Sequence, residues 1–384
     1  MVGTNGGKGR GRDGDPSRRR LALWLAPTLI LAAFTGAGIA ISVHSSSAPT
    51  PSTTTTSLAL TTTTTVPPTV TLSAVGDTEL GNTPDVPSNP IRYLQPIRAA
   101  LAAPIVFGNL EGTLTNATTS KCAPASSECY AFRAPTAFAS VYRAVGFTIL
   151  NSANNHSHDF GEEGAIDTSK ALSAAGIAQA GLPGQIGVVS DGTVRVAFVD
   201  FAPYFNTNDL LNFPAAARLI AKAKQLANVV VVYMHAGAEG EQADHVTRQT
   251  ETYVGEDRGN PYAFAHAAIN DGAGLVIASG PHVLRGMEWY RGHLIAYSLG
   301  DFANFENFSA AGDLDLSVIL HVTLTSTGTF VSGHFTSVRL TSAGQPFVDP
   351  TDASAVFVNQ LSKEDFGADA AIIAANGSIE RLAR

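Results

Sequence analysis

The chain has 384 residues, of which 45% are hydrophobic and 15% charged, and this supplies enough apolar material for a packed core and excludes disorder throughout. The formal net charge of -8 argues against a nucleic-acid partner, because a surface that binds nucleic acid has to be basic. The charge is unevenly spread. Basic residues cluster within residues 1–20, which are expected to be a cytoplasmic basic segment.

An uncharged apolar stretch follows at residues 21–43. It is long enough to cross a bilayer, which takes about 20 residues, whereas the apolar part of a signal peptide is about 7–15 residues long. The stretch is therefore expected to be a transmembrane anchor, with a cleaved signal peptide as the alternative. Because basic flanks stay in the cytoplasm, the sequence predicts a single-pass protein of the cell membrane with an extracytoplasmic C-terminal domain. Residues 44–69, rich in Ser, Thr and Pro, predict a solvated linker.

A folded domain is expected to begin at residue 70, where apolar runs typical of strands alternate with helical patterns. Strands are predicted at 70–75, 104–107, 147–150, 194–198, 229–234 and 275–278. Helices are predicted over 136–145 and 162–175, and from Pro214 and Pro261, because Pro favours the first turn of a helix.

The pattern changes after residue 283, where paired apolar runs flank short turns typical of hairpins. The two pairs are 283–290 with 293–299, and 316–325 with 329–340. Alternating strands and helices followed by hairpins predict a layered α/β domain with parallel and antiparallel strands, over residues 70–345. Residues 346–384 are expected to form a C-terminal helical tail.

The two cysteines, Cys122 and Cys129, lie close together in a stretch rich in Ser, Ala and Pro. In an oxidising compartment this pair predicts a local disulfide. A zinc site is the alternative, but it needs more ligands, and residues 115–135 contain no histidine.

Side chains with metal-binding chemistry follow five of the predicted strands. In chain order these are Asp77 with Glu79, then Glu111, then Asn154-Asn155-His156, then His235, then His282. Ligands of α/β sheets bind at the carboxyl ends of the strands, so these side chains are expected to meet. Carboxylate, amide and imidazole groups suit a divalent ion such as Mn, Zn or Fe. Each residue alone has a plainer reading, as a cap, a turn residue or a structural histidine, and it is their repetition that predicts a metal site.

The sequence also resembles the CapA family of poly-γ-glutamate capsule synthesis, which is related in fold to calcineurin-like metallophosphatases. The resemblance covers residues 70–305 and rests on a set of blocks in a fixed order: Val75-Gly76-Asp77-Thr78, Gly108-Asn109-Leu110-Glu111-Gly112, Asn154-Asn155-His156, Met234-His235-Ala236-Gly237, Pro281-His282-Val283-Leu284 and Ala296-Tyr297-Ser298-Leu299-Gly300. It implies a four-layer α/β/β/α sandwich with mixed sheets and a site for one or two metal ions.

The resemblance also implies roles for individual residues. One ion would be held by Asp77, Glu111 and His282. Glu111 would bridge to a second ion held by Asn155 and His235. Three further roles are expected: proton donation by His156, metal binding by Glu79, and substrate contacts by Asn109, Asn154 and His158.

Two positions depart from the family pattern. Gly280 stands where the family offers an imidazole, and Asp301 stands where the family has Asn. The sequence therefore predicts one tightly held ion and a weak second position, and it predicts that Gly280→His raises the metal content.

The function predicted from these features is metal-dependent hydrolysis of a phosphoester or amide in a cell-envelope or other anionic polymer, in capsule or poly-γ-glutamate synthesis. The alternative is a non-catalytic component that binds, exports or anchors an envelope polymer and has a degenerate metal site. The expected partners are that polymer and the membrane.

Overall fold

The computed structural model describes residues 67–123 and 129–381. The elements below belong to a single unit, Thr64–Arg384. The predicted basic segment, the predicted anchor and all but the last residues of the predicted linker lie outside the described ranges. Within those ranges, no helix combines the length and the apolar character that crossing a bilayer requires.

The first sheet has eight strands in the order β18-β17-β16-β1-β2-β5-β6, with β15 also paired to β1. Four strands run parallel to one another: β1 (Thr69–Glu79), β2 (Ile105–Leu110), β5 (Ile149–Asn151) and β6 (Ala178–Ala180). β15 (Asp301–Asn304) is also parallel to β1. The antiparallel part consists of β16 (Leu316–Thr325), β17 (Phe330–Leu340) and β18 (Pro346–Val348).

The second sheet has six strands in the order β13-β14-β12-β9-β8-β7. Its parallel centre is made of β8 (Val194–Phe201), β9 (Val229–His235), β12 (Leu275–Ser279) and β14 (His293–Ala296). Two strands run antiparallel at its edges, β7 (Gly187–Asp191) and β13 (Met287–Tyr290).

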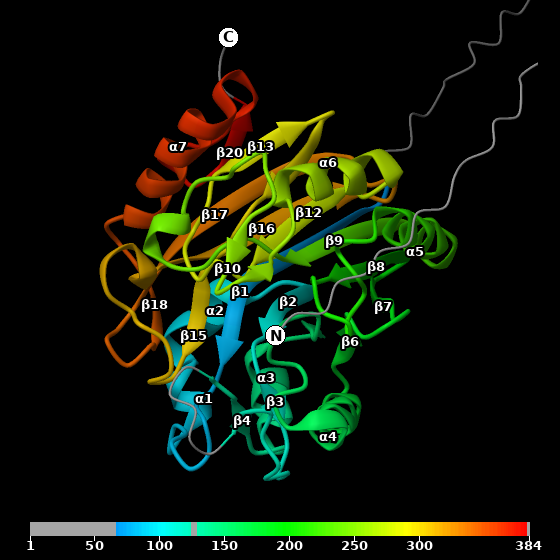
Figure 1. Ribbon diagram of the computed structural model, residues 1–384. Coiled ribbons are helices and arrows are strands. Elements are labelled where there is room, and N and C mark those ends of the chain that lie inside the picture. Colours follow the sequence, from blue (N-terminus) through cyan, green and yellow to red (C-terminus); the bar gives the residue numbers. More distant parts are fainter. Residues whose placement is uncertain (1–66, 124–128, 382–384) are drawn as a thin grey trace, which may run out of the picture. The chain divides into compact units, whose positions relative to one another are not determined.

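The two sheets pack face to face around a shared apolar core. Side chains of both inner faces form one cluster, in which Phe107 of β2 stacks on Phe198 of β8 with ring centroids 5.1 Å apart. The outer face of the first sheet is covered by α1 (Pro90–Tyr93), α2 (Arg98–Leu101), α3 (Phe138–Val145) and α4 (Gly161–Ala174). The outer face of the second is covered by α5 (Phe213–Leu226) and α6 (Pro261–Asp271) (Figure 1). The expected four-layer α/β/β/α sandwich with mixed sheets is confirmed.

Local sequence signals account for several element boundaries. The side chains of Asn212 and Asn260 cap α5 and α6 by accepting hydrogen bonds from backbone N–H groups three residues on, and a Pro follows in each first turn. In the β13–β14 hairpin, Arg291 and Gly292 both have positive φ, at 53° and 92°, as a two-residue turn requires.

The strands run further than their apolar runs predict. β1 continues to Glu79, β9 includes His235 and β12 includes Ser279. These polar residues stay in the ladders because neighbouring strands pair with them, as Ser279 pairs with His235. Asp77 and His235 therefore stand within strands, whereas Glu111, His156 and His282 follow shortly after strand ends.

The segment expected to be a helical tail is only partly helical. It contains α7 (Ala353–Phe366) together with β18 and a small sheet of β19 (Ala371–Ile373) and β20 (Ile379–Arg381). Val358, Ile373 and Ile379 join the core between the sheets, so the segment is an integral part of the domain. The remaining short elements are β3 (Thr113–Leu114), β4 (Arg133–Ala134), β10 (Thr252–Tyr253), β11 (Glu256–Asp257), η1 (Gln95–Ile97), η2 (Glu241–Ala243), η3 (Gly312–Asp315) and η4 (Gly367–Asp369).

Candidate metal centre

The carboxyl ends of the central strands of both sheets meet at one end of the sandwich. Asp77 of β1 is in register with Asn109 of β2 and with Asp301 of β15. In the second sheet Ser279 of β12 is in register with His235 of β9, and the Ser279 hydroxyl donates a hydrogen bond to Asp77. Polar side chains of the two sheets thus contact one another across the end of the apolar core.

Asp77, Glu111 and His235 form the first of two groups whose ligand atoms all lie within 4.8 Å of one another. His235 Nε2 is 3.6 Å from Glu111 Oε1. Asp77 Oδ2, Glu111 Oε1 and His235 Nε2 are all buried without a hydrogen-bond partner. Burying unpaired polar atoms is costly, and a divalent cation would satisfy all three atoms together. The residues present therefore fit a metal ion.

The second group consists of Asp77, His282 and Asp301. His282 Nδ1 lies 2.8 Å from Asp301 Oδ1 and 3.2 Å from Asp77 Oδ2. Asp77 is common to both groups, whereas the resemblance assigns the bridging position to Glu111. Asp301, which stood out in the sequence only as a departure from the family pattern, belongs to the centre.

A layer of side-chain amides holds the first group from behind. The Asn109 amide donates to Asp77 Oδ1 at 2.6 Å and also to Glu111. Asn151 and Asn154 in turn donate to Asn109 Oδ1, at 2.6 and 2.8 Å. All three amides are fully buried, so their contacts in the structure position the carboxylates. The substrate contacts expected of Asn109 and Asn154 stay predictions.

Burial sets the protonation of the centre. It raises the pKa of Glu111 well above the usual carboxyl range, and the Asp77 charge adds to this. It lowers the pKa of His235 well below that of a free imidazole. Burial opposes the charged forms of Asp77 and His282 too. The nearby His282 outweighs this effect for Asp77 and lowers its pKa, whereas the carboxylates of Asp301 and Asp77 raise the His282 pKa well above normal.

Glu79 and Asn155 were expected to be ligands, and neither belongs to the two groups. Glu79 accepts a hydrogen bond from Asn307, and burial raises its pKa to about 8. Asn155 has a buried side-chain oxygen, Oδ1, without a partner, which leaves that atom free to bind a cation. Metal binding by both residues stays a prediction.

His156 is paired with a residue that the sequence analysis missed. Its Nδ1 lies 2.7 Å from Asp159 Oδ2, and Asp159 is fully buried. The carboxylate fixes Nδ1 as the protonated nitrogen and leaves Nε2 free to transfer a proton. The three-residue spacing after His156 was the available signal for Asp159. His158 lies nearby, with Nε2 3.8 Å from Glu162.

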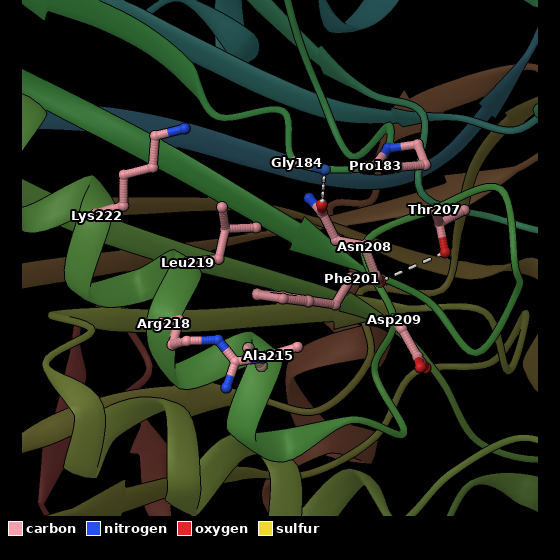
Figure 2. Close-up of a pocket in the computed structure, with 11 residues that line it drawn as sticks. Pro183, Gly184, Phe201, Thr207, Asn208, Asp209, Ala215, Arg218, Leu219 and Lys222 are labelled. Carbon is pink, nitrogen blue, oxygen red and sulfur yellow. Dashed lines mark hydrogen bonds between the residues drawn. The ribbon is translucent and has the colours of Figure 1, made fainter.

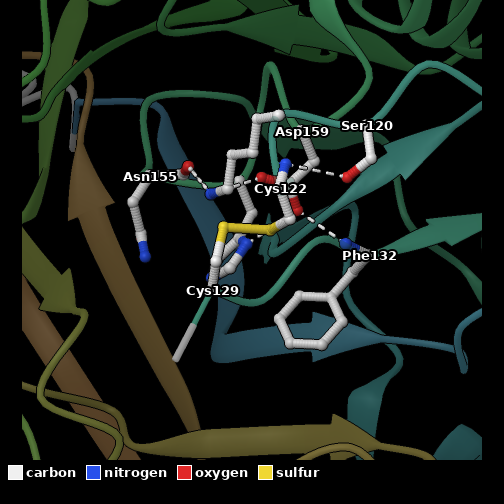
Figure 3. Close-up of a disulfide and its surroundings, with 8 residues drawn as sticks. Ser120, Cys122, Cys129, Phe132, Asn155 and Asp159 are labelled. Atoms are coloured by element: carbon white, nitrogen blue, oxygen red, sulfur yellow. Dashed lines mark hydrogen bonds and ion pairs between the residues drawn. A yellow bond between two sulfur atoms is a disulfide. The ribbon is translucent and has the colours of Figure 1, made fainter. Parts of the chain in front are cut away.

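The predicted disulfide between Cys122 and Cys129 is confirmed, and it lies close to Asp159 (Figure 3). Lys121, adjacent to Cys122, places its Nζ 2.6 Å from Asp159 Oδ1 and donates to the backbone oxygen of Asn155 at 3.0 Å. The disulfide therefore lies directly after the lysine that pairs with the carboxylate behind His156.

A cavity of about 890 Å³ opens over the centre. His156, His158, His282 and Asp301 line it, together with Asn155. A second cavity of about 340 Å³ lies between α5 and the loop after β8 (Figure 2). Its lining includes Phe201, Arg218 and Leu219 but no histidine, and its buried amide, Asn208, is already bonded to backbone groups. The larger cavity is the candidate substrate site.

Gly280 has a backbone conformation that disfavours a side chain, which the sequence did not reveal. Its φ is +111°, and a Cβ there would lie 3.1 Å from the His235 ring and from the backbone nitrogen of Ala236. A side chain would be strained and would press on His235. Gly280→His is thus expected to disturb the centre, and the gain in metal content predicted from the sequence conflicts with this geometry.

A comparison with known protein families assigns the chain to a family. The family model of the bacterial capsule synthesis protein PGA_cap matches residues 71–306, more than half of the chain. The chain belongs to this family. Among its curated relatives, the PGA biosynthesis protein CapA of Bacillus subtilis (strain 168) is 30% identical over 258 residues, or 62% of each chain. The capsule biosynthesis protein CapA of Bacillus anthracis is 27% identical over 242 residues, or 58% of this chain and 55% of that protein. The match thus spans less than two thirds of these relatives.

Solved structures similar to the chain include, by title, a putative 5'-nucleotidase and a purple acid phosphatase. A putative 5'-nucleotidase from Staphylococcus aureus has a TM-score of 0.41 at 14% identity and covers 76% of this chain and 58% of that one. A purple acid phosphatase from yellow lupin has a TM-score of 0.35 at 11% identity and covers 74% of this chain and 53% of that one. The fold is assigned from the sheets and helical layers described above.

Proposed function

We propose that this PGA_cap-family protein is a metal-dependent hydrolase that cleaves a phosphoester or amide in a cell-envelope polymer. The observation that carries the proposal is the set of three buried ligand atoms without hydrogen-bond partners, on Asp77, Glu111 and His235, in a centre whose His282 and Asp301 line the large cavity. Burying such atoms without hydrogen-bond partners costs folding free energy, and a bound cation would offset that cost.

The chain supplies the groups that such a reaction needs. Asp77, Glu111 and His235 would hold the ion, which when bound supplies charge stabilisation and polarises a water molecule. His156 lines the cavity, and Asp159 keeps its ring oriented with the proton on Nδ1. Nε2 is then the nitrogen that takes up a second proton from the solvent-filled cavity and donates it to the leaving group, and Asp159 stabilises the imidazolium formed. The buried amides fix the carboxylates, so the centre needs little rearrangement when the substrate binds.

The test uses the purified full chain, loaded with Mn²⁺ or Zn²⁺ and supplied with p-nitrophenyl phosphate, bis-p-nitrophenyl phosphate and a γ-glutamyl anilide. Turnover of at least one substrate is expected, and His156→Ala should slow it by about 10²–10⁴-fold while the metal content stays unchanged. His245→Ala is the matched control, because His245 is half exposed and bonded to Asp365 away from the centre. Equal activity in His156→Ala would remove its proposed role.

A second candidate is a protein that binds, exports or anchors an envelope polymer without cleaving it. Two observations favour it: Gly280 offers no side chain to the centre, and His282 is paired with the carboxylates of Asp77 and Asp301, so that these groups already balance part of one another's charge. Retention of an envelope polymer with no turnover under any tested metal would support this candidate over the hydrolase.

The proposal places the domain outside the cell, held by residues 21–43, because the basic residues before this stretch favour the cytoplasm. Protease added to intact cells with a permeable wall should then release the domain by cutting the Ser/Thr/Pro-rich linker. Full protection of the domain would contradict this topology.

A further inference from the structure

The exposed aromatic side chains of this protein are concentrated at the candidate site. Among the described residues, the exposed large hydrophobic side chains include three aromatic ones, Tyr130, Phe205 and Tyr253, which are 64%, 98% and 39% exposed. All three line the cavity over the candidate metal centre. They come from three different segments: the end of the disulfide loop, the loop after β8, and β10. Exposed apolar surface gathered in this way marks a binding surface.

The apolar surface continues from this rim down to the centre. Phe308 also lines the cavity, and its ring stacks on the His282 imidazole with centroids 4.7 Å apart. Tyr204 lies beneath the Arg258 guanidinium, 5.8 Å from it. A substrate that reaches the metal centre therefore passes along aromatic faces.

The charges of the cavity disfavour a densely anionic substrate segment at this rim. The basic side chains closest to the centre among its described lining residues are already paired: Lys121 with Asp159 and Arg258 with Glu239, each at 2.6 Å, and His282 with Asp301 at 2.8 Å. Glu256, also in the lining, is exposed and adds a negative charge. A polymer with a carboxylate on every unit would have no free cation to meet among these residues.

We propose that the aromatic rim, defined as Tyr130, Phe205 and Tyr253, binds sugar rings of a neutral glycan segment of the substrate. The C–H groups on the face of a pyranose ring carry a slight positive charge, which matches the negative face of an aromatic ring. Asn206, Asn307 and Ser309 in the same lining offer donors and acceptors for sugar hydroxyls. The inference rests on the proposed function, because it assumes that the group to be cleaved lies at the metal centre. The glycan segment of the same substrate then lies along the aromatic rim.

The experiment measures binding by calorimetry, with the full chain in detergent and with chelator present so that no turnover occurs. The probes are chitotetraose, cellotetraose, tetra-γ-glutamate and adenosine. We expect at least one tetrasaccharide to bind more tightly than tetra-γ-glutamate and adenosine. Phe205→Ala and Tyr253→Ala should each weaken that binding by about three- to tenfold, while Phe205→Tyr keeps it. Leu226→Ala, at an exposed apolar residue that does not line this cavity, is the matched control.

Three outcomes would overturn the inference: absence of tetrasaccharide binding, binding that Phe205→Ala and Tyr253→Ala leave unchanged, or tighter binding of tetra-γ-glutamate or adenosine by the same residues. Its failure is separable from that of the proposed function. Hydrolysis without ring-dependent sugar binding refutes the aromatic rim alone, and ring-dependent sugar binding without hydrolysis refutes the hydrolase alone.

Discussion

The two groups of the candidate metal centre share Asp77 but satisfy their polar atoms differently. Around Glu111 and His235, buried ligand atoms have no hydrogen-bond partner, and Glu111 Oε1 and His235 Nε2 are 3.6 Å apart. Around His282 and Asp301, a nitrogen and an oxygen are already bonded at 2.8 Å. The ligand atoms of the first group lack the hydrogen bonds that a bound cation would replace, whereas in the second group the His282 imidazole already pairs with two carboxylates. The comparison suggests that metal binding energy comes mainly from the Glu111 side.

The largest expected effect is therefore the loss of a ligand on that side. Glu111→Ala and His235→Ala should each weaken metal binding by more than about 100-fold, because a ligand is lost and the remaining atoms stay unpaired. Elemental analysis after dialysis measures this, with His266→Ala as control, since His266 pairs with Glu288 outside the centre. Metal content close to that of the unaltered protein would show that the ion is bound elsewhere.

A smaller effect on metal binding is expected from the second group, at His282 and Asp301. Asp301→Asn keeps the size of the side chain but removes the charge that pairs with His282, and it should weaken metal binding by about 10–100-fold, the range for a residue that orients a ligand. Asp365→Asn is the matched control, because Asp365 binds His245 away from the centre. A loss larger than that of Glu111→Ala would reverse the comparison and assign the ion to the His282 side.

The pH dependence of binding tests the same comparison. Because burial raises the pKa of Glu111 well above normal, the metal-free protein carries a proton there that has to leave before the carboxylate binds the ion. Affinity should rise with pH, by up to about tenfold per unit for each proton released. Calorimetry in buffers of different ionisation heat counts these protons. Binding without proton release would contradict the protonated state of Glu111.

The smallest effect is expected at Glu79, which lies outside both groups. Its folded-state pKa of about 8 exceeds the usual value of 4.5, so its contribution to stability is full below the usual value and is lost as pH rises through 8. The melting temperature of the metal-free protein should fall between pH 6 and pH 9, and Glu79→Gln should flatten this fall. Identical profiles for the two proteins would show that Glu79 does not titrate in this range.

Much of the fold follows from local patterns in the chain. The apolar runs marked most central strands, Pro214 and Pro261 marked the starts of α5 and α6, and Arg291-Gly292 marked a hairpin. These signals are readable because each depends on residues within a few positions of one another. The polar residues that end the runs also indicated where side chains with metal-binding chemistry stand.

How those side chains combine was decided by the tertiary structure. Pairing of β1 with β15 brings Asp301 beside Asp77, although 224 positions separate them in the chain (301 − 77). Packing of the second sheet on the first brings His235 to Glu111, and the positive φ of Gly280 disfavours any residue with a side chain there. The sequence by itself determined which chemical groups are present and that they stand at strand ends. Which of them share an ion depends on sheet order and on distances of a few ångströms, and these arise only when the two sheets close over one core.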